Sequence, residues 1–501
     1  MAIPTDPNLA IADGAGSGAN SDVLPRQPNL LTKDSVIGFC GRAARSRWFV
    51  GASTVVMTLY FYYLITEGSF DPNHLQTNFG TGPRFFWAQA NSMLSGHLDV
   101  DPSVIKFESW RVDGKSYGYF GVFPSVLRMP FVLALGPDND GLVPLFLTAS
   151  ISVAFYFALD LVRRVLFEKH PFAGPSENAR NAVYLAFSAL ALGPASVLIV
   201  LAHPFVYQEA IAWSVAGACV FANMFWRWSR TRSAWALGVS VVALVAAANA
   251  RPTVFPVGIV IAVGMCIVLL RRRELSRGLA ATFATLAIAP IATAVAVFWA
   301  KFGMFPPDYK MYELYQSEVW QKLVITNGGV SNSWRYMPTN LFGYFRPDTL
   351  DVGSGSPWFG FRFGLNEPFT YLPPLVDGTM ITENPLSVTP IMPVPVILMP
   401  FTFLCLLTRK LLNSVEQSAE FLLILAFAVI VIVTLSQPST AARYVADFYP
   451  LMVAALAFSP VFLARLASVD RVIWRVITVS AFLVTGLSVV ILNQLLPQIG
   501  Y

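Results

Sequence analysis

Residues 253–300 read TVFPVGIVIAVGMCIVLLRRRELSRGLAATFATLAIAPIATAVAVFWA. Two apolar blocks, 253–271 and 279–300, flank a turn that contains three arginines, and a fourth, Arg271, ends the first block. Each block is about 20 residues long, the length that an α-helix needs to cross a hydrocarbon core about 30 Å thick. The clustered arginines favour a cytoplasmic turn, because Lys and Arg concentrate in cytoplasmic loops. The stretch therefore predicts a pair of membrane-spanning helices.

The whole chain has the same character. Of its 501 residues, 55% are hydrophobic and 13% are charged, against about 25% charged residues in soluble domains. This excludes an ordinary soluble enzyme. The 35 prolines and 33 glycines often lie in or beside apolar blocks, and interrupted helices are tolerated in membranes only where protein or a cavity satisfies the freed backbone groups. We therefore expect an internal cavity.

Apolar blocks of spanning length predict an all-α polytopic membrane protein with about eleven spans, and up to about thirteen if marginal segments cross. The first span starts near Trp48 and is preceded by three arginines. The basic loops that follow indicate a cytoplasmic N-terminus and an outward C-terminus. The other spans are expected at 141–163, 182–201, 204–225, 233–250, 253–271, 279–300, 389–408, 418–436, 442–465 and 473–495.

This pattern divides the chain into four regions. Residues 1–47 are expected to form a disordered cytoplasmic tail with a basic flank, because they are rich in Pro, Gly, Asn and Ser. An N-terminal membrane module covers 48–300 and includes a first outward loop at 67–140. An outward aromatic loop region follows at 301–388, and a C-terminal membrane module covers 389–501.

Two segments of the first outward loop are apolar. Residues 117–136 are long enough to cross the membrane, but a crossing there would place the basic residues after 162 outside. We therefore expect a re-entrant or interfacial segment. Residues 83–98 predict an amphipathic juxtamembrane helix whose Phe85, Trp87, Met93 and Leu94 lie in the interface plane.

Carboxylates in the first outward loop are candidates for a general base. A solvated loop charge is the alternative for any one of them. A carboxylate held between a span and a segment that folds back on the membrane could lie at a lipid-facing cavity and accept a proton. The group is Asp71, Asp99, Asp101, Glu108 and Asp113.

Arginines at the outer ends of spans are the second candidate group. Arg251 and Arg443 end or begin apolar blocks, and Arg128 lies inside the 117–136 segment. Ionisable groups at membrane depth are usually functional and usually paired. They either form structural pairs, for example Arg443 with Asp447 one helical turn later, or bind an anionic head group together with Lys115.

Glu209 lies inside an apolar span, with Tyr207 close by. A buried glutamate in a membrane helix needs a partner, so it either pairs with an arginine or lines the cavity. A proton-coupled transporter would use such a residue as well. The histidines show no ligand spacing and the four cysteines form no CxxC pair, so we expect no metal site and no cofactor. The sequence does not indicate a divalent cation.

Several stretches resemble the GT-C superfamily of membrane glycosyltransferases, which use polyprenyl-phosphate sugars as donors. They are FDPNHLQTNFGTGPRFFWAQANSMLSGHLDVDPS at 70–103, ESWRVDGKSYGYFGVFPSVLRMPF at 108–131, YQEAIAW at 207–213, ARPT at 250–253 and RYVADFYP at 443–450. The chain resembles protein O-mannosyltransferases and lipid A aminoarabinose transferases, and most of all uncharacterised bacterial members.

The resemblance implies roles for particular residues. Asp71 resembles the acidic residue that O-mannosyltransferases carry after their first span, although Pro72 replaces a second acidic residue. The position of the key aspartate of the aminoarabinose transferases falls at Gly80 to Gly82, so Glu108 is the second candidate for the base. The donor phosphate is assigned to Lys115, Arg128, Arg251 and Arg443, and the cavity or acceptor to Arg84, Tyr117, Tyr207, Glu209 and Asp447.

The implied activity is inverting transfer of a hexosyl or pentosyl group from a polyprenyl-phosphate donor to a glycan, lipid or protein acceptor of the cell envelope. The expected location is a bacterial inner membrane, with the site facing the periplasm or exterior and no nucleic-acid partner. A lipid or lipid-linked-sugar flippase is the alternative. Transporters tend to contain internal repeats, and this chain shows none while it places two long loops outside. A non-catalytic membrane subunit or a polysaccharide polymerase that shares the architecture is a further rival.

Overall fold

A computed structural model of the chain describes residues 46–72, 82–137, 142–165, 196–202, 206–313, 321, 333–346, 350–352, 359–361, 380–381, 393–408, 414–437, 439–440, 442–459 and 483. Six helices within these residues are long and apolar enough to cross a membrane. They are α2 (Arg47–Ile65), α6 (Val143–Arg164), α8 (Val206–Thr231), α10 (Phe255–Arg271, preceded by the 3₁₀-helix η4, Pro252–Val254), α11 (Arg277–Phe302) and α16 (Val415–Leu435).

Other predicted spans form a shorter helix or are described only in part. Residues 233–250 form α9 (Ala234–Ala248), 389–408 form α15 (Pro393–Thr408), and 442–465 begin as the 3₁₀-helix η9 (Ala442–Phe448) before α17 (Tyr449–Phe458). Of 182–201 only the 3₁₀-helix η3 (Ser196–Leu201) is described. The predicted tail before residue 46 and nearly all of the span at 473–495 lie outside the described residues. The helical membrane fold is thus confirmed, while the number of spans stays a prediction.

Neighbouring long helices run antiparallel, and serine residues mark one end of the bundle. The helices α2, α9, α11 and α16 all begin at that end, and in each a serine side chain accepts a hydrogen bond from a backbone N–H of the first turn. Such N-caps satisfy donors that the helix leaves unpaired. The capping residues are Ser46, Ser233, Ser276 and Ser414.

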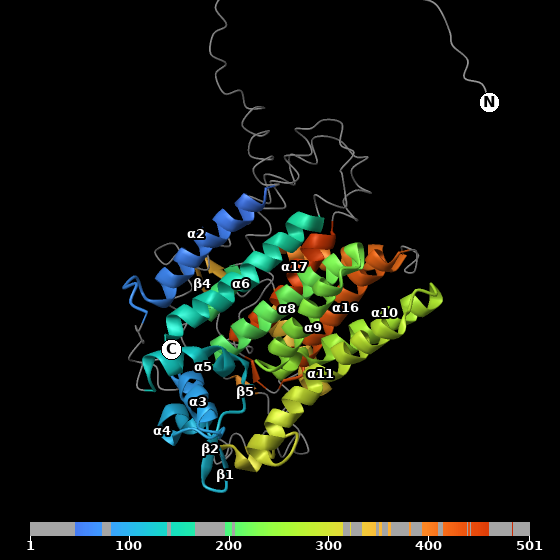
Figure 1. The fold of residues 1–501 in the computed structure, drawn as a ribbon. Coiled ribbons are helices and arrows are strands. Elements are labelled where there is room, and N and C mark those ends of the chain that lie inside the picture. The colour runs from blue at the N-terminus through green and yellow to red at the C-terminus, as the bar shows by residue number, and fades with distance from the viewer. Residues whose placement is uncertain are drawn as a thin grey trace, which may run out of the picture.

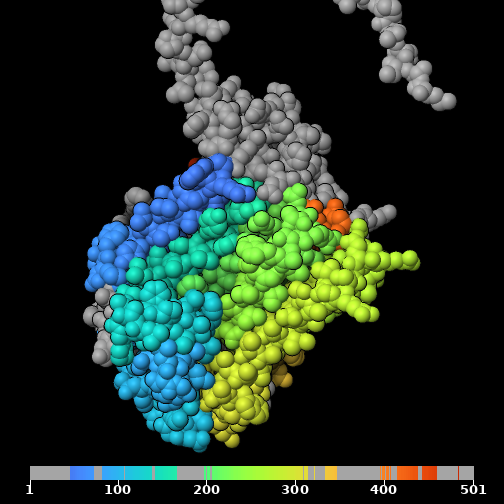
Figure 2. Space-filling model, viewed as in Figure 1, coloured from blue at the N-terminus to red at the C-terminus, as the bar shows by residue number. Residues whose placement is uncertain are grey.

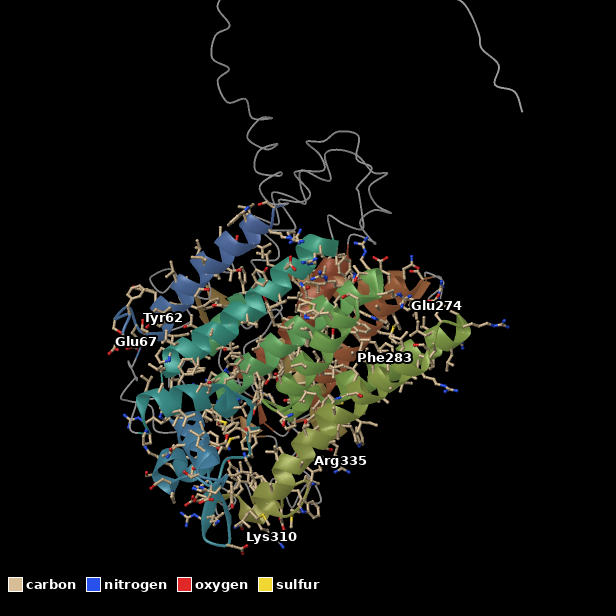
Figure 3. The ribbon with its side chains drawn as sticks, in the orientation of Figure 1. Tyr62, Glu67, Glu274, Phe283, Lys310 and Arg335 are labelled. Carbon is tan, nitrogen blue, oxygen red and sulfur yellow. The ribbon has the colours of Figure 1, made fainter. Side chains whose placement is uncertain are left out.

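Basic residues gather at the same end. The helices α6, α8 and α10 finish there with Arg163, Arg230 and Arg271 in their last turns. Figure 3 shows Glu274, from the turn between α10 and α11, far from Lys310, which lies at the opposite end of the molecule. We call these the basic end and the opposite end. Of the basic loops that the sequence predicted on one side of the membrane, the three that follow α6, α8 and α10 begin at one end of the bundle, and those from Arg409 and Arg465 lie outside the described residues.

The first outward loop folds against the opposite end (Figure 1). It contains α3 (Phe85–Leu94), α4 (Pro102–Ile105), the 3₁₀-helix η1 (Lys106–Glu108), a hairpin of β1 (Trp110–Val112) and β2 (Lys115–Tyr117), and α5 (Phe123–Leu135). The hairpin turn is Asp113-Gly114, and both residues have positive φ, as the favoured two-residue turns require. Figure 2 shows this loop beside the yellow end of α11.

Neither apolar segment of the first outward loop forms a helix long enough to cross the membrane. α5 has 13 residues and contains Pro130, so it is too short to cross the membrane, in agreement with the predicted re-entrant or interfacial segment. A helix within the predicted 83–98 stretch is found as α3, while its juxtamembrane location stays a prediction. However, Phe85 and Trp87 are buried inside the protein and do not lie in the lipid interface, because α3 packs its aromatic side chains against α5, Phe120 and Val206.

The remaining described elements belong to the 301–388 region, which the sequence predicts to be a second outward loop, and to the C-terminal region. Tyr312 and Glu313 follow a short 3₁₀-helix in that loop and reach the first loop. The elements are η5 (Tyr309–Met311), η7 (Trp334–Tyr336), α13 (Met337–Phe345), the antiparallel pair β3 (Leu350–Val352) and β4 (Phe359–Phe361), and the parallel pair β5 (Met380–Ile381) and β6 (Ser439–Thr440).

Close helix packing gives a first testable prediction. A Cβ atom on Gly258 of α10 would lie 2.3 Å from the carbonyl oxygen of Leu286 in α11. Gly258→Ala is therefore expected to lower the free energy of unfolding by about 1–3 kcal/mol, as overpacking does. Gly238→Ala in α9 is the matched control, because a Cβ there meets no atom within 4 Å and is expected to stabilise by up to about 1 kcal/mol. Denaturation in detergent measures both variants, and equal stabilities would contradict the packing argument.

Candidate active site

Glu108 is held at the opposite end of the bundle by a short capped helix. Asp101 Oδ1 accepts a hydrogen bond of 2.7 Å from Ser103 N, and Pro102 occupies the first helical position of α4, where proline is favoured. The chain then turns through η1, which ends at Glu108. Glu108 as a whole residue is 7% exposed. A buried carboxylate at the end of a membrane bundle requires partners.

Two tyrosine hydroxyls supply those partners. Tyr312 Oη donates to Glu108 Oε2 at 2.6 Å, and Tyr207 Oη donates to the same oxygen. Within the part of the chain that the structure describes, no group donates to Oε1. One carboxylate oxygen is therefore anchored by two phenols, while the other remains available to accept a proton.

Tyr312 reaches Glu108 because the second outward loop docks on the first. Its ring stacks on Trp110 with centroids 5.0 Å apart, and Glu313 N donates to Ser109 O at 2.9 Å. Arg111 Nη2 lies 2.9 Å from Glu313 Oε1. Burial and the neighbouring Glu108 carboxylate raise the pKa of Tyr312, so its phenol stays protonated and remains a hydrogen-bond donor at neutral pH.

Two predicted arginines join this cluster. The Arg443 guanidinium lies over the Tyr207 ring, 4.2 Å from its centroid, so Tyr207 contacts Glu108 with its hydroxyl and Arg443 with its ring face. Arg251 Nη2 lies 3.0 Å from Asp447 Oδ2, and its guanidinium lies 4.9 Å from the centroid of Tyr444. The alternative pairing of Arg443 with Asp447 is thus wrong, because η9 directs Asp447 toward Arg251, where Thr434 also donates to it at 3.2 Å.

Tyr119 completes the cluster and was not singled out in the sequence. Its ring lies 5.9 Å from that of Tyr207. Burial raises the pKa of Tyr119, Tyr444 and Glu108 raise it further, and Arg251 and Arg443 partly oppose the shift. Tyr119 thus adjoins Tyr207, the residue that contacts both Glu108 and Arg443. Only its place in the quoted YGYFG run could have pointed to it.

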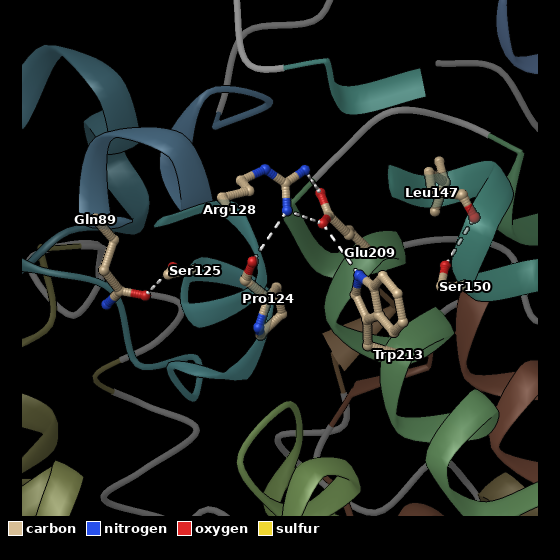
Figure 4. Close-up of polar contacts among 8 residues, drawn as sticks. All are labelled: Gln89, Pro124, Ser125, Arg128, Leu147, Ser150, Glu209 and Trp213. Carbon is tan, nitrogen blue, oxygen red and sulfur yellow. Dashed lines mark hydrogen bonds and ion pairs between the residues drawn. The ribbon is translucent and has the colours of Figure 1, made fainter. Parts of the chain in front are cut away.

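Arg128 and Glu209 form a separate buried pair (Figure 4). Arg128 Nη2 lies 2.9 Å from Glu209 Oε2, and Trp213 Nε1 donates to Glu209 at 3.3 Å. The Arg128 side chain is 0% exposed and lies 4.0 Å from the centroid of Phe146. The structure therefore favours the structural pairing that the sequence offered for Glu209, and Arg128 has no exposed surface at which to meet a donor phosphate.

The other predicted residues lie elsewhere on the outward loop. Asp71 is exposed just after α2, and Arg84 is exposed at the start of α3. Lys115 is 57% exposed, with its ammonium 3.7 Å from Asp99 Oδ1. Tyr117 is buried against Phe302. Their predicted roles stay predictions.

The described residues contain no group of three or more His, Cys, Asp or Glu side chains that could hold a metal ion. The chemistry that they do bring together is a buried carboxylate with an available oxygen, two arginines and a set of aromatic rings. Such a site can accept a proton from a hydroxyl and stabilise a phosphate.

Comparison with known proteins defines the class of fold. No protein-family model matches the chain, and no curated protein matches it. The apo crystal structure of the Archaeoglobus fulgidus oligosaccharyltransferase matches with a TM-score of 0.50 at 13% identity, over 89% of this chain and 56% of that one. A structure of oligosaccharyltransferase AglB from the same organism, in complex with an inhibitory peptide and a dolichol-phosphate, has a TM-score of 0.48 at 11% identity, over 91% of this chain and 56% of that one.

The chain is thus an integral membrane protein with a GT-C-type helical fold. It spans 56% of the length of the oligosaccharyltransferase that it matches. At this identity the likeness establishes the fold alone, and function has to be argued from the site. The resemblance to O-mannosyltransferases and aminoarabinose transferases stays a resemblance.

Proposed function

We propose that the chain is a membrane glycosyltransferase that moves a sugar from a polyprenyl-phosphate donor to a hydroxyl of a cell-envelope glycan, lipid or protein. One observation carries the proposal. Tyr207 joins Glu108 to Arg443, so a proton acceptor and a phosphate-binding cation meet at one end of a GT-C-type bundle. Ionisable groups in a membrane helix bundle, such as the Glu108 carboxylate and the Arg443 guanidinium, are usually either paired or functional.

The chemistry is a single displacement at the anomeric carbon. Glu108 Oε1 takes the proton of the acceptor hydroxyl as its oxygen forms a bond to that carbon. The bond from the anomeric carbon to the phosphate oxygen breaks, and its electron pair stays on the phosphate. A positioned base contributes about 10²- to 10⁴-fold to such a step. Inversion of the anomeric configuration follows from a single displacement.

The protein prepares both charges before substrate binds. Tyr207 and Tyr312 anchor Glu108 Oε2, which leaves Oε1 oriented for the acceptor. Arg251 is held by Asp447, and Arg443 is held by the Tyr207 and Tyr444 rings. Charges that need no reorganisation stabilise a developing phosphate anion most effectively. Arg251 and Arg443, rather than Arg128, are therefore the proposed phosphate ligands.

The site is proposed to face outward in a bacterial inner membrane. It lies at the end opposite to the basic turns of α8–α9 and α10–α11, and basic loops favour the cytoplasmic side. Nucleotide sugars are cytoplasmic, so a donor used on the outer face would be linked to a lipid. The grooves between spans would hold the polyprenyl chain.

The test is sugar transfer by the purified protein in lipid, with a panel of radiolabelled polyprenyl-phosphate sugars. Transfer from at least one donor to a hydroxyl acceptor is expected. The product is expected to have the opposite anomeric configuration, which NMR can assign. Binding of a lipid-linked sugar without transfer from any donor would overturn the proposal and favour the flippase alternative.

Arg443→Gln tests the phosphate site. Loss of a charge-assisted hydrogen bond, worth about 1.5–3 kcal/mol, is expected to raise KM for the donor by about 10- to 100-fold. Arg251 is not replaced in this test, because its loss would leave Asp447 without its ion pair. Arg335→Gln, at an exposed position of η7, is the control and is expected to leave KM unchanged. An unchanged KM in Arg443→Gln would remove that residue from the donor site.

A further inference from the structure

Lys301 is a buried lysine that the proposed chemistry does not use. It lies one residue before the end of α11 and is 2% exposed. Its ammonium donates to the carbonyl oxygens of Gly118 at 3.0 Å and Phe120 at 2.7 Å. Among the described residues, no carboxylate forms an ion pair with it. Burying an ammonium group without a carboxylate partner costs free energy. The position of Lys301 against two carbonyl oxygens therefore calls for a functional explanation.

Those carbonyls flank Tyr119. The residues on either side of the tyrosine are thus tied to α11, while its ring lies 5.9 Å from that of Tyr207, which donates to Glu108 and lies under the Arg443 guanidinium. The end of α11 is packed firmly on the first outward loop, since Phe302 contacts Trp110 and Tyr117 at ring distances of 5.7 and 5.8 Å. The helix end that carries Lys301 is therefore fixed against the first outward loop by these ring contacts.

The other side of the same turn is held by Asn249, two residues before Arg251. Phe123 N donates to Asn249 O at 3.0 Å, and a Cβ on Gly121 would lie 1.7 Å from that oxygen. The backbones meet so closely that only glycine fits. Asn249 Nδ2 in turn donates to Thr293 Oγ1 of α11 at 2.7 Å. The turn 118–123 is thus clamped between α11 and the segment that carries Arg251.

We propose that Lys301 is a positioning residue, which fixes the turn 118–123 so that Tyr119 and Arg251 keep their places in the donor-phosphate site. The inference deepens the proposed function and rests on its donor class. Lys301 touches neither donor nor acceptor. It acts through the two carbonyls, in the way that a support shell holds the groups of a site within a fraction of an ångström.

The experiment uses the full chain in lipid nanodiscs. Lys301→Met keeps the length of the side chain and removes its N–H groups, whereas Lys301→Arg keeps donors for the carbonyls. Lys310→Met is the control, because it removes an exposed lysine of η5, nine residues after Lys301. Hydrogen exchange of amides 119–123 reports the turn. The dissociation constant for a sugar-free polyprenyl phosphate reports the site without any transfer reaction.

In Lys301→Met, exchange of amides 119–123 is expected to be about ten times faster, with a dissociation constant raised about tenfold. Lys301→Arg and Lys310→Met are expected to behave as the wild type. Gly121→Ala places a methyl group against the Asn249 carbonyl oxygen and is expected to displace the turn. It should therefore also give faster exchange and a raised dissociation constant, and it replaces Lys301→Met in the test if that variant does not fold.

Unchanged exchange in Lys301→Met and Gly121→Ala would overturn the inference. Faster exchange with unchanged binding would also overturn it, since the turn would then hold nothing that the phosphate needs. Failure of the proposed function looks different, because the wild type would then transfer no sugar from any donor while exchange and lipid-phosphate binding could still respond to Lys301→Met.

Discussion

Glu108→Gln is expected to lower the rate of sugar transfer by about 10²- to 10⁴-fold, the range that a positioned general base contributes. Glutamine keeps the size of the side chain, and its carbonyl oxygen can still accept the hydroxyls of Tyr207 and Tyr312. The amide lacks a basic oxygen for the acceptor proton. The variant loses the proton acceptor but keeps the volume and the tyrosine contacts of the side chain. The kcat for sugar transfer is therefore expected to fall, while KM for the donor stays near the wild-type value. Single-turnover transfer measures the chemical step.

Asp71→Asn is the matched control, because both carboxylates are candidates in the same outward loop. Asp71 is exposed, and the structure gives Glu108 the anchored, buried environment. Asp71→Asn is therefore expected to retain most of the activity. Full activity in Glu108→Gln together with loss in Asp71→Asn would reverse the assignment of the base. Full activity in both variants would exclude proton removal by either carboxylate.

Arg128→Met is expected to lower the free energy of unfolding by about 3–5 kcal/mol, the cost of leaving one partner of a buried ion pair alone. Glu209 would keep only the indole N–H of Trp213 within the contacts of this pair. The variant tests stability rather than catalysis. Unfolding of the purified protein in mixed micelles, followed by circular dichroism, measures the loss.

Two further variants make that result specific. The double replacement of Arg128 and Glu209 by methionine is expected to recover most of the lost stability, since an apolar pair of similar volume often replaces a buried ion pair at no cost. Arg232→Met breaks the exposed pair with Glu274, at 3.0 Å, and is expected to cost about 0–1 kcal/mol. A small effect of Arg128→Met would show that the pair contributes little. Loss of donor binding at unchanged stability would return Arg128 to the phosphate site.

The spans could be predicted because a membrane imposes their length and composition on a continuous stretch of sequence. The 253–271 and 279–300 blocks became α10 and α11 with nearly those bounds. Helix ends near the site were harder. Residues 442–448 form a 3₁₀-helix instead of the start of an α-helix, and this change of geometry sends Asp447 to Arg251.

Pairings between distant segments could not be predicted from one sequence. Glu209 clearly needed a partner, but nothing near it in the sequence indicated Arg128. Glu108 was one of several acidic residues of a loop until the hydroxyls of Tyr207 and Tyr312 distinguished it. Lys301 ended an apolar block and resembled any basic residue at the end of a span. Its two carbonyl partners belong to a turn whose shape no local pattern reveals.

The docking of Tyr312 on the first outward loop has a consequence for biosynthesis. Glu108 leaves the ribosome early, Tyr207 follows with α8, and Tyr312 and Arg443 are made much later. A nascent chain that has inserted α2 to α10 therefore holds a carboxylate with only one of its two phenol anchors and no second arginine. Under the proposed function, such an intermediate is not expected to transfer sugar while translation continues. The proposed reaction centre is completed by Tyr312, which follows η5, and by Arg443 of η9, so a chain truncated after α11 is expected to lack transfer activity.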